Sequence, residues 1–270
     1  MINFIKNEED ESIQENLYTM DSITSTLEAL SLGKAVEAEA VEAEPVLELC
    51  PIPESIDLAK LSEYVSTYMI PRSEFYKETG RNLYIEDEFS EWWLAKASSG
   101  IQIGKGSEGT DVKTSINEGV DAMCVIMNKT QSNEKSLIQN FSESGIDLDS
   151  LFKDKKDKEA VDKYMAVYKT KLESVQTKHS LTALYILAFI STQTEIHICC
   201  FKLHLDRIST VASSGFTEAG KNIRITGFID NSLGLVCLYK SKKRVELRLK
   251  KECITHEHAR KIYTTVSKES

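Results

Sequence analysis

The sequence contains little proline and no cysteine pair of the C-x-x-C type. Of its 270 residues, 4 are Pro, 12 are Gly and 41% are hydrophobic, which excludes a collagen-like chain and a wholly disordered one. No apolar run approaches the roughly 18 residues of a membrane-spanning helix. The first residues lack the basic and apolar regions of a secretory signal. Its six Cys are typical of free thiols in a reducing compartment, so we expect a cytoplasmic globular protein.

Acidic side chains are concentrated at the start of the chain. Residues 1–60 carry 14 Asp and Glu against 3 Lys, whereas the whole chain has a net charge of −9. The segment AVEAE occurs twice in tandem, at 35–39 and 40–44, and prolines follow it. This composition predicts a disordered acidic arm over residues 1–53 and a single folded domain over 54–270.

Apolar periodicity predicts a domain that mixes helices and strands. Helical spacing is expected over 57–69, 84–97, 131–142, 156–178 and 255–266. Strands are expected over 101–103, 110–115, 120–127, 181–190, 194–205, 223–229, 233–239 and 244–250. This order predicts an α/β or α+β fold with a central mixed sheet flanked by helices.

Two aspartates fall on consecutive predicted strands behind a helix that carries glutamates. Asp111 and Lys113 share one face of the first strand, and Asp121 begins the second. A hairpin can bring the two carboxylates together, and Mg²⁺ relieves their repulsion while it keeps several waters. A nearby lysine, Lys113, can position a water for attack on a phosphate. We therefore predict a metal-dependent hydrolytic site.

This arrangement resembles the PD-(D/E)xK nuclease superfamily, which includes most type II restriction endonucleases. The superfamily pattern is a strand Asp followed by (Asp/Glu)-x-Lys on the next strand. By position, Asp111 resembles the first Asp and Asp121 the second acidic residue, and the resemblance covers roughly residues 80–205. The superfamily often adds a helix glutamate, for which Glu91 or Glu88 is the candidate. It sometimes adds a glutamine on a later helix, for which Gln139 is the candidate.

The chain departs from the pattern at the lysine. Asp121-Ala122-Met123 has methionine where the superfamily has lysine. Lys113 is the first candidate to replace it, and Lys129 or Lys135 are the others. The resemblance implies a restriction-endonuclease-like core, a Mg²⁺ cofactor held by Asp111, Asp121 and Glu91, and a homodimer that acts on double-stranded DNA.

A glycine-rich segment lies within the same region. Gly104-Lys105-Gly106-Ser107-Glu108-Gly109 matches G-x-G-x-x-G, but it leads into a predicted strand and not into the helix that a dinucleotide site requires. The chain also lacks the HRD and DFG motifs of a kinase. These glycines therefore indicate a bend beside the sheet more than a nucleotide site.

Basic residues gather near the end of the chain. Between 221 and 261 there are 11 Lys and Arg against 4 Asp and Glu. We predict that the members of this group in and around the last strand contact DNA: Lys240, Lys242, Lys243, Arg244 and Arg248.

The sequence thus favours a Mg²⁺-dependent, sequence-specific DNA endonuclease similar to a type II restriction enzyme. Two alternatives stay open. One is a non-catalytic nucleic-acid-binding protein that keeps the nuclease-like fold, which the Met123 departure favours. The other is an adaptor that binds protein partners through the acidic segment 1–48.

Overall fold

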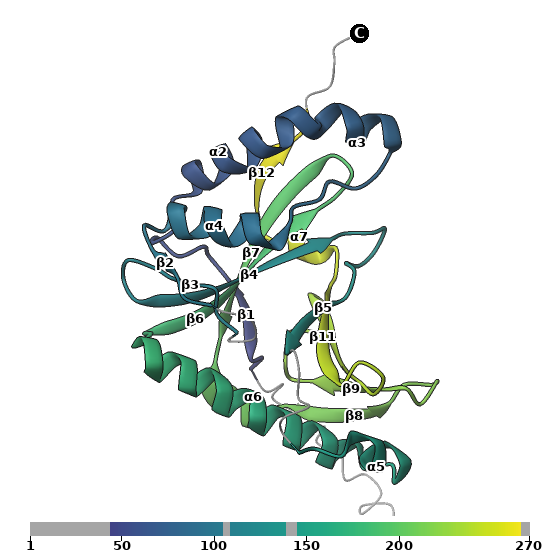
Figure 1. Cartoon of the computed structure of the whole chain (residues 1–270). Helices are drawn as coiled ribbons and strands as arrows, with labels where there is room; N and C mark the ends of the chain where they lie inside the picture. Colours follow the sequence, from purple (N-terminus) through teal and green to yellow (C-terminus); the bar gives the residue numbers. More distant parts are fainter. Residues whose placement is uncertain (1–43, 105–108, 139–144, 266–270) are drawn as a thin grey trace, which may run out of the picture. The chain divides into compact units, whose positions relative to one another are not determined.

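A mixed β-sheet lies at the centre of the molecule. The computed structural model describes residues 44–104, 109–138 and 145–265, all within the unit Ala43–Ser270. Within these residues, seven strands form the larger sheet in the order β1-β7-β6-β4-β3-β2, and β12 also pairs with β7 (Figure 1). The strands are β1 (Leu47–Cys50), β2 (Ile101–Gln102), β3 (Val112–Lys113), β4 (Glu118–Ile126), β6 (Ala183–Ser191), β7 (Glu195–Leu203) and β12 (Arg260–Thr264). Only β4 and β6 run parallel among the paired strands described here.

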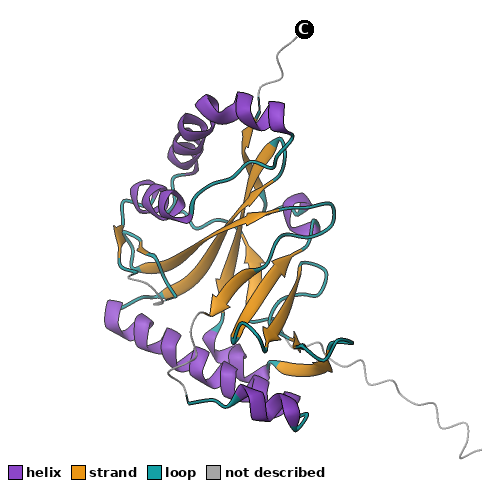
Figure 2. Ribbon diagram, turned by 45° about the vertical axis from the view of Figure 1, so that its right-hand side comes forward, coloured by secondary structure: helices purple, strands orange, loops and turns teal. Residues whose placement is uncertain are grey.

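Helices cover both faces of this sheet. The helices are α2 (Leu58–Met69), α3 (Ser73–Thr79), α4 (Asp87–Ala97), α5 (Leu148–Lys153), α6 (Asp157–His179) and α7 (Glu252–Thr255). Short 3-10 helices follow α2 and β7, at Ile70–Arg72 and Leu205–Thr210. Helices α2 and α4 lie on one side of the strands and α6 on the other (Figure 1, Figure 2). A parallel strand pair needs a crossover connection, and the segment containing α6 supplies it between β4 and β6.

The central strand β6 supplies both layers of the core. Its residues alternate between the two faces, as the two-residue period of a strand requires. Leu187 and Phe189 pack with Trp93 on the α4 side, whereas Ile186 and Ala188 belong to the cluster on the other side. Because both faces are covered, this strand reads as a continuous apolar run in the sequence.

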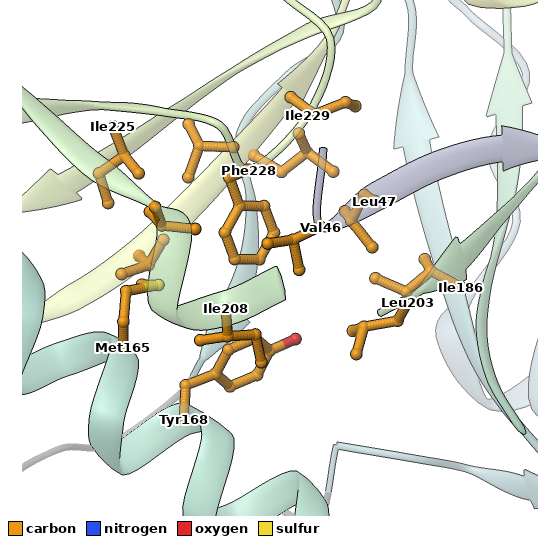
Figure 3. Close-up of a cluster of buried hydrophobic side chains, with 14 of the residues drawn as sticks. Val46, Leu47, Met165, Tyr168, Ile186, Leu203, Ile208, Ile225, Phe228 and Ile229 are labelled. Atoms are coloured by element: carbon orange, nitrogen blue, oxygen red, sulfur yellow. The ribbon is translucent and has the colours of Figure 1, made fainter. Parts of the chain in front are cut away.

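A second, five-stranded sheet packs against α6. Within the described residues its order is β5-β11-β10-β9-β8, with all neighbours antiparallel. The strands are β5 (Lys135–Ile138), β8 (Ala212–Phe216), β9 (Asn222–Thr226), β10 (Gly234–Tyr239) and β11 (Arg244–Leu249). Side chains from both sheets and from α6 meet in one cluster, in which Met165 and Tyr168 of α6 lie near Ile225, Phe228 and Val46 (Figure 3).

Three segments differ from the sequence prediction because of long-range pairing. The predicted helix at 131–142 contains strand β5, which pairs with β11 more than 100 residues later. The predicted helix at 255–266 contains strand β12, which pairs with the edge of β7. The folded part also begins before residue 54, because Leu47 of β1 is fully buried against β7. In all three, tertiary contacts override local propensity.

Two further expectations concern the acidic arm and membrane-spanning helices. The acidic arm up to residue 43 lies outside the described residues. Across the described segments, no helix combines the length and the apolar character needed to cross a bilayer.

Candidate active site

Strands β3 and β4 separate soon after they pair, and this opening positions the candidate site. The two strands pair only at Val112 with Val120 and at Lys113 with Gly119. Beyond Val120, β4 continues to Ile126 with no described strand paired to it on that side. Asp111 stands directly before β3, at the point of separation. Its side chain therefore faces backbone groups of β4 that a longer β3 would have bonded.

Asp111 and Asp121 lie side by side at this opening. Asp111 Oδ2 accepts a hydrogen bond from the Ala122 N–H at 2.8 Å, which satisfies a donor that the sheet ladder leaves unpaired. The two carboxyl groups are also within hydrogen-bonding distance of each other. Burial raises the pKa of both groups, and the charge of Asp111 raises the pKa of Asp121 further, well above its usual range. The pair predicted from the sequence is thus brought together in space.

Helix α4 brings two further carboxylates to the pair. Asp87 and Glu91 are four residues apart and so share one face of the helix. Burial raises the pKa of Glu91 to about 7, and the charges of Asp111 and Asp87 add to the effect. The site therefore carries more negative charge than its surroundings stabilise, and it favours a cation.

Lys135, on β5, is the amine of this site. Its Nζ lies 2.6 and 2.8 Å from the two carboxylate oxygens of Asp87. Its positive charge also opposes the rise in the pKa of Glu91, Asp111 and Asp121. Sequence reasoning names Lys135 only as a substitute for the missing motif lysine, because its segment has the pattern of a helix and not of a strand. The four-residue spacing to Glu91 is the signal that identifies Asp87.

The structure places Lys113 elsewhere. Its Nζ donates a hydrogen bond to the backbone oxygen of His179 at 2.8 Å, at the C-terminal end of α6. It therefore does not meet Asp111 in the way that strand alternation predicted. Met123, which occupies the lysine position of the motif, is 2% exposed and belongs to the core on the α6 side.

The other candidates have varied positions. Glu88 is exposed on α4, and Lys129 is exposed directly after β4. Gln139 lies outside the described residues, as do 105–108 of the glycine-rich segment. Gly104 is described, and a Cβ there would lie 2.8 Å from the Thr110 carbonyl oxygen and 3.1 Å from the Asp111 Cα. The absence of a side chain at this position therefore lets the backbone pass close beside Asp111.

Most of the basic cluster is paired with acidic groups. Glu246 of β11 is 1% exposed and accepts hydrogen bonds from Lys242 at 3.0 Å and from Arg244 at 2.5 Å. Glu134 accepts from Lys242 and Arg248. Burial alone would raise the pKa of Glu134, but these hydrogen bonds outweigh it and lower the pKa.

This pairing changes the interpretation of the cluster. By alternation, Glu246 shares a face of β11 with Arg244 and Arg248, and on that face Glu246 is buried beneath its cations. Lys240 lies 3.4 Å from Asp149, and Lys243 is exposed at the turn before β11. Lys242, Arg244 and Arg248 thus all form ion pairs with acidic side chains of the protein itself.

The carboxylates fit a magnesium site of the simplest kind. Among the described residues, no group of three or more His, Cys, Asp or Glu side chains is arranged to hold a metal ion. Mg²⁺ is commonly bound by one or two carboxylates together with waters and substrate phosphates. Asp111 and Asp121, close together and partly buried, form such a donor pair. Glu91 lies near enough to act on their charge, but it is not a third member of a metal-holding group.

Comparison of the chain with family models, curated proteins and solved structures finds no match.

Proposed function

We propose that the protein is a Mg²⁺-dependent nuclease that hydrolyses phosphodiester bonds in double-stranded DNA and resembles the PD-(D/E)xK superfamily in its active site. The observation that carries this proposal is the juxtaposition of Asp111 and Asp121 at the opening between β3 and β4, with Lys135 beside them.

The reaction needs a water, a phosphodiester and groups that stabilise the negative charge that develops on the phosphate. A water oxygen bonds to phosphorus, one bridging P–O bond breaks, and its electron pair stays on the departing oxygen. The water loses a proton to solvent and the departing oxygen takes one up. When Mg²⁺ is bound, it supplies positive charge that offsets the charge developing on the phosphate.

The residues of the chain have separate tasks in this proposal. Asp111 and Asp121 would hold the ion, and the hydrogen bond from Ala122 fixes the Asp111 carboxylate. The Lys135 ammonium, held by Asp87, orients the attacking water or a phosphate oxygen. Lys135 thus takes the task that the superfamily gives to the lysine of its motif, at the position that Met123 occupies here.

The first experiment compares Asp111→Asn and Asp121→Asn with the wild type. Each replacement keeps the shape of the side chain and removes its charge, so both variants should fold but lose cleavage of phage-length DNA in Mg²⁺. They should also lose the rise in melting temperature that Mg²⁺ gives the wild type, because an ion that binds only the folded state stabilises it. Asp162→Asn, an exposed change on α6, is the matched control. Cleavage by Asp121→Asn at the wild-type rate would overturn the assignment.

The second experiment tests Lys135. Lys135→Met should lower kcat by about 10²-fold or more with little change in KM, as expected when a group that stabilises the transition state is removed. Lys113→Met is the control, because its amine bonds to His179 instead. Equal losses in both variants would refute the role of Lys135.

A non-catalytic nucleic-acid-binding protein is the second candidate, and the buried Met123 is the observation that favours it. It predicts that the wild type binds DNA and Mg²⁺ but leaves the DNA intact.

The nuclease proposal also includes a homodimer, because cutting both strands of a symmetric site calls for two copies. Sedimentation with and without DNA measures this.

A further inference from the structure

Three pockets adjoin one another near the end of β4. Their volumes are about 500, 450 and 720 Å³. Asn82 and Gln193 line both the first and the second, and Asn128 and Lys129 line both the second and the third. The shared residues make the three pockets neighbours on the surface, and we call them together the β4-end groove. It runs from α3, past the turn after β4, to the surface over β11.

One end of the β4-end groove lies beside the candidate active site. Tyr84 and Ile126 line its first pocket. Burial raises the pKa of Tyr84, and the charges of Asp87 and Lys135 also act on it, so Tyr84 lies close to that ion pair. A strand lying in the groove would therefore pass near the Asp87–Lys135 ion pair of the candidate site.

The groove carries cations that have no acidic partner. Arg81, Lys129 and Lys251 are exposed, and no acidic side chain of the described residues forms an ion pair with them. This distinguishes them from Lys242 and Arg248, whose charges are satisfied by Glu134. An unpaired cation is available to a phosphate, whereas a paired one must first lose its partner.

Aromatic and amide side chains complete the lining. Phe75 is 52% exposed and Tyr84 is 47% exposed, so both rings are accessible from solvent. Between these rings and Lys129 lie the amide groups of Asn82 and Gln193. Cations that track a backbone, rings that stack on bases and amides that bond to base edges together are typical of a nucleic-acid groove.

We propose that the β4-end groove binds a nucleic-acid strand, with its phosphates on Arg81, Lys129 and Lys251 and its bases against Phe75 and Tyr84. This inference rests on the proposed nuclease function, because it makes the groove the path by which the strand reaches Asp111 and Asp121. It moves the principal phosphate contacts from the basic cluster at β11 to residues that sequence reasoning did not select, apart from Lys129.

The test measures binding without cleavage. Fluorescein-labelled 20-nucleotide single strands and the matching duplex are titrated in EDTA at several salt concentrations. The double variant Lys129→Met/Lys251→Met should bind both more weakly and flatten the slope of log K against log salt, by about 1.4 for the single strand and about 1.8 for the duplex. The control Lys153→Met/Lys158→Met removes two exposed lysines from the α5–α6 region and should leave the slope unchanged.

A ring variant separates the two forms of the strand. If bases stack in the groove, Phe75→Leu should weaken binding of the single strand by about tenfold or more and barely change the duplex. If the groove holds only the phosphates of a duplex, Phe75→Leu should change neither, while the double lysine variant still acts. The first pattern supports the stacking of bases on Phe75, whereas the second overturns that part of the proposal and leaves only the phosphate contacts.

The outcomes distinguish the two proposals. An unchanged salt slope in Lys129→Met/Lys251→Met, with wild-type melting, overturns the groove even if the wild type cuts DNA. A wild type that binds through these lysines but never cuts in Mg²⁺ overturns the nuclease proposal and leaves the groove standing.

Discussion

Replacing Lys242 by Met should destabilise the protein, whereas the same change at the adjacent Lys243 should not. Lys242 Nζ lies 3.0 Å from both carboxylate oxygens of Glu246, and it also bonds to Glu134. Lys243 is exposed at the turn. Methionine keeps the apolar stem of each lysine, so the comparison isolates the charge.

The magnitude follows from the environment of Glu246. Hydrogen bonds to charged groups are each worth about 1.5–3 kcal/mol. The Lys242 side chain is 38% exposed, so water replaces part of the lost interaction, and Arg244 stays bonded to Glu246. We therefore expect a loss of about 1–2 kcal/mol for Lys242→Met and less than about 0.5 kcal/mol for Lys243→Met. For a domain of this size the first value is a fall in melting temperature of about 2–8 °C.

Urea unfolding and calorimetry of the two variants in parallel provide the measurement. Equal stabilities would show that Lys242 does not support the buried carboxylate, and the basic cluster would again be available for DNA. The salt dependence of DNA binding gives an independent readout. A slope flattened by about 0.9 in Lys242→Met, with wild-type stability, would mean that this amine contacts a phosphate and not Glu246.

Two further predictions concern the same packing. Because hydrogen bonds lower the pKa of Glu134 below 4.5, the unfolded chain binds more protons in acid, so the free energy of unfolding should fall as the pH drops below about 4.5. Urea titrations at pH 6 and pH 3.5 measure this fall, and Glu134→Gln should reduce it. A chain that begins at residue 44 should melt higher than one that begins at residue 51, because the second lacks β1, whose Leu47 is fully buried against β7. Equal melting temperatures would show that β1 contributes no stability.

Helices α2, α4 and α6 could be predicted because the information for them is local. Each has an apolar stripe at helical spacing, and the buried residues of α6 are those that the stripe identifies, such as Val161, Tyr164 and Leu172. Strand β6 was equally accessible, since a strand covered on both faces must be apolar throughout. Patterns of this kind require no knowledge of the partner segment.

The parts that could not be predicted depend on partners far along the chain. Strand β5 becomes extended because Lys135 and Ser136 pair with β11, whose sequence position gives no local hint of the contact. The burial of Glu246 arises in the same way, because Glu134 and Lys242 cover a face that alternation alone assigns to solvent. Long-range pairing therefore determines both the extended conformation of β5 and the burial of Glu246 beside it.

The position of the site lysine follows from these pairings. On β4, Asp121 and Met123 share a face, and the charge of Asp121 acts on Tyr168 of α6, so this face is the one packed against α6. A lysine at 123 would place an ammonium in a cluster where the methionine is 2% exposed, at a cost that a neutral thioether avoids. The opening between β3 and β4 leaves a second route by which a side chain can approach the two aspartates, and β5, the next strand along the chain, lies after this opening. The Lys135 ammonium of β5 is held by Asp87 on α4, and from there its charge acts on Asp111 and Asp121. In the proposed site, the position of the amine therefore depends on where the sheet opens and not on the spacing of residues along one strand.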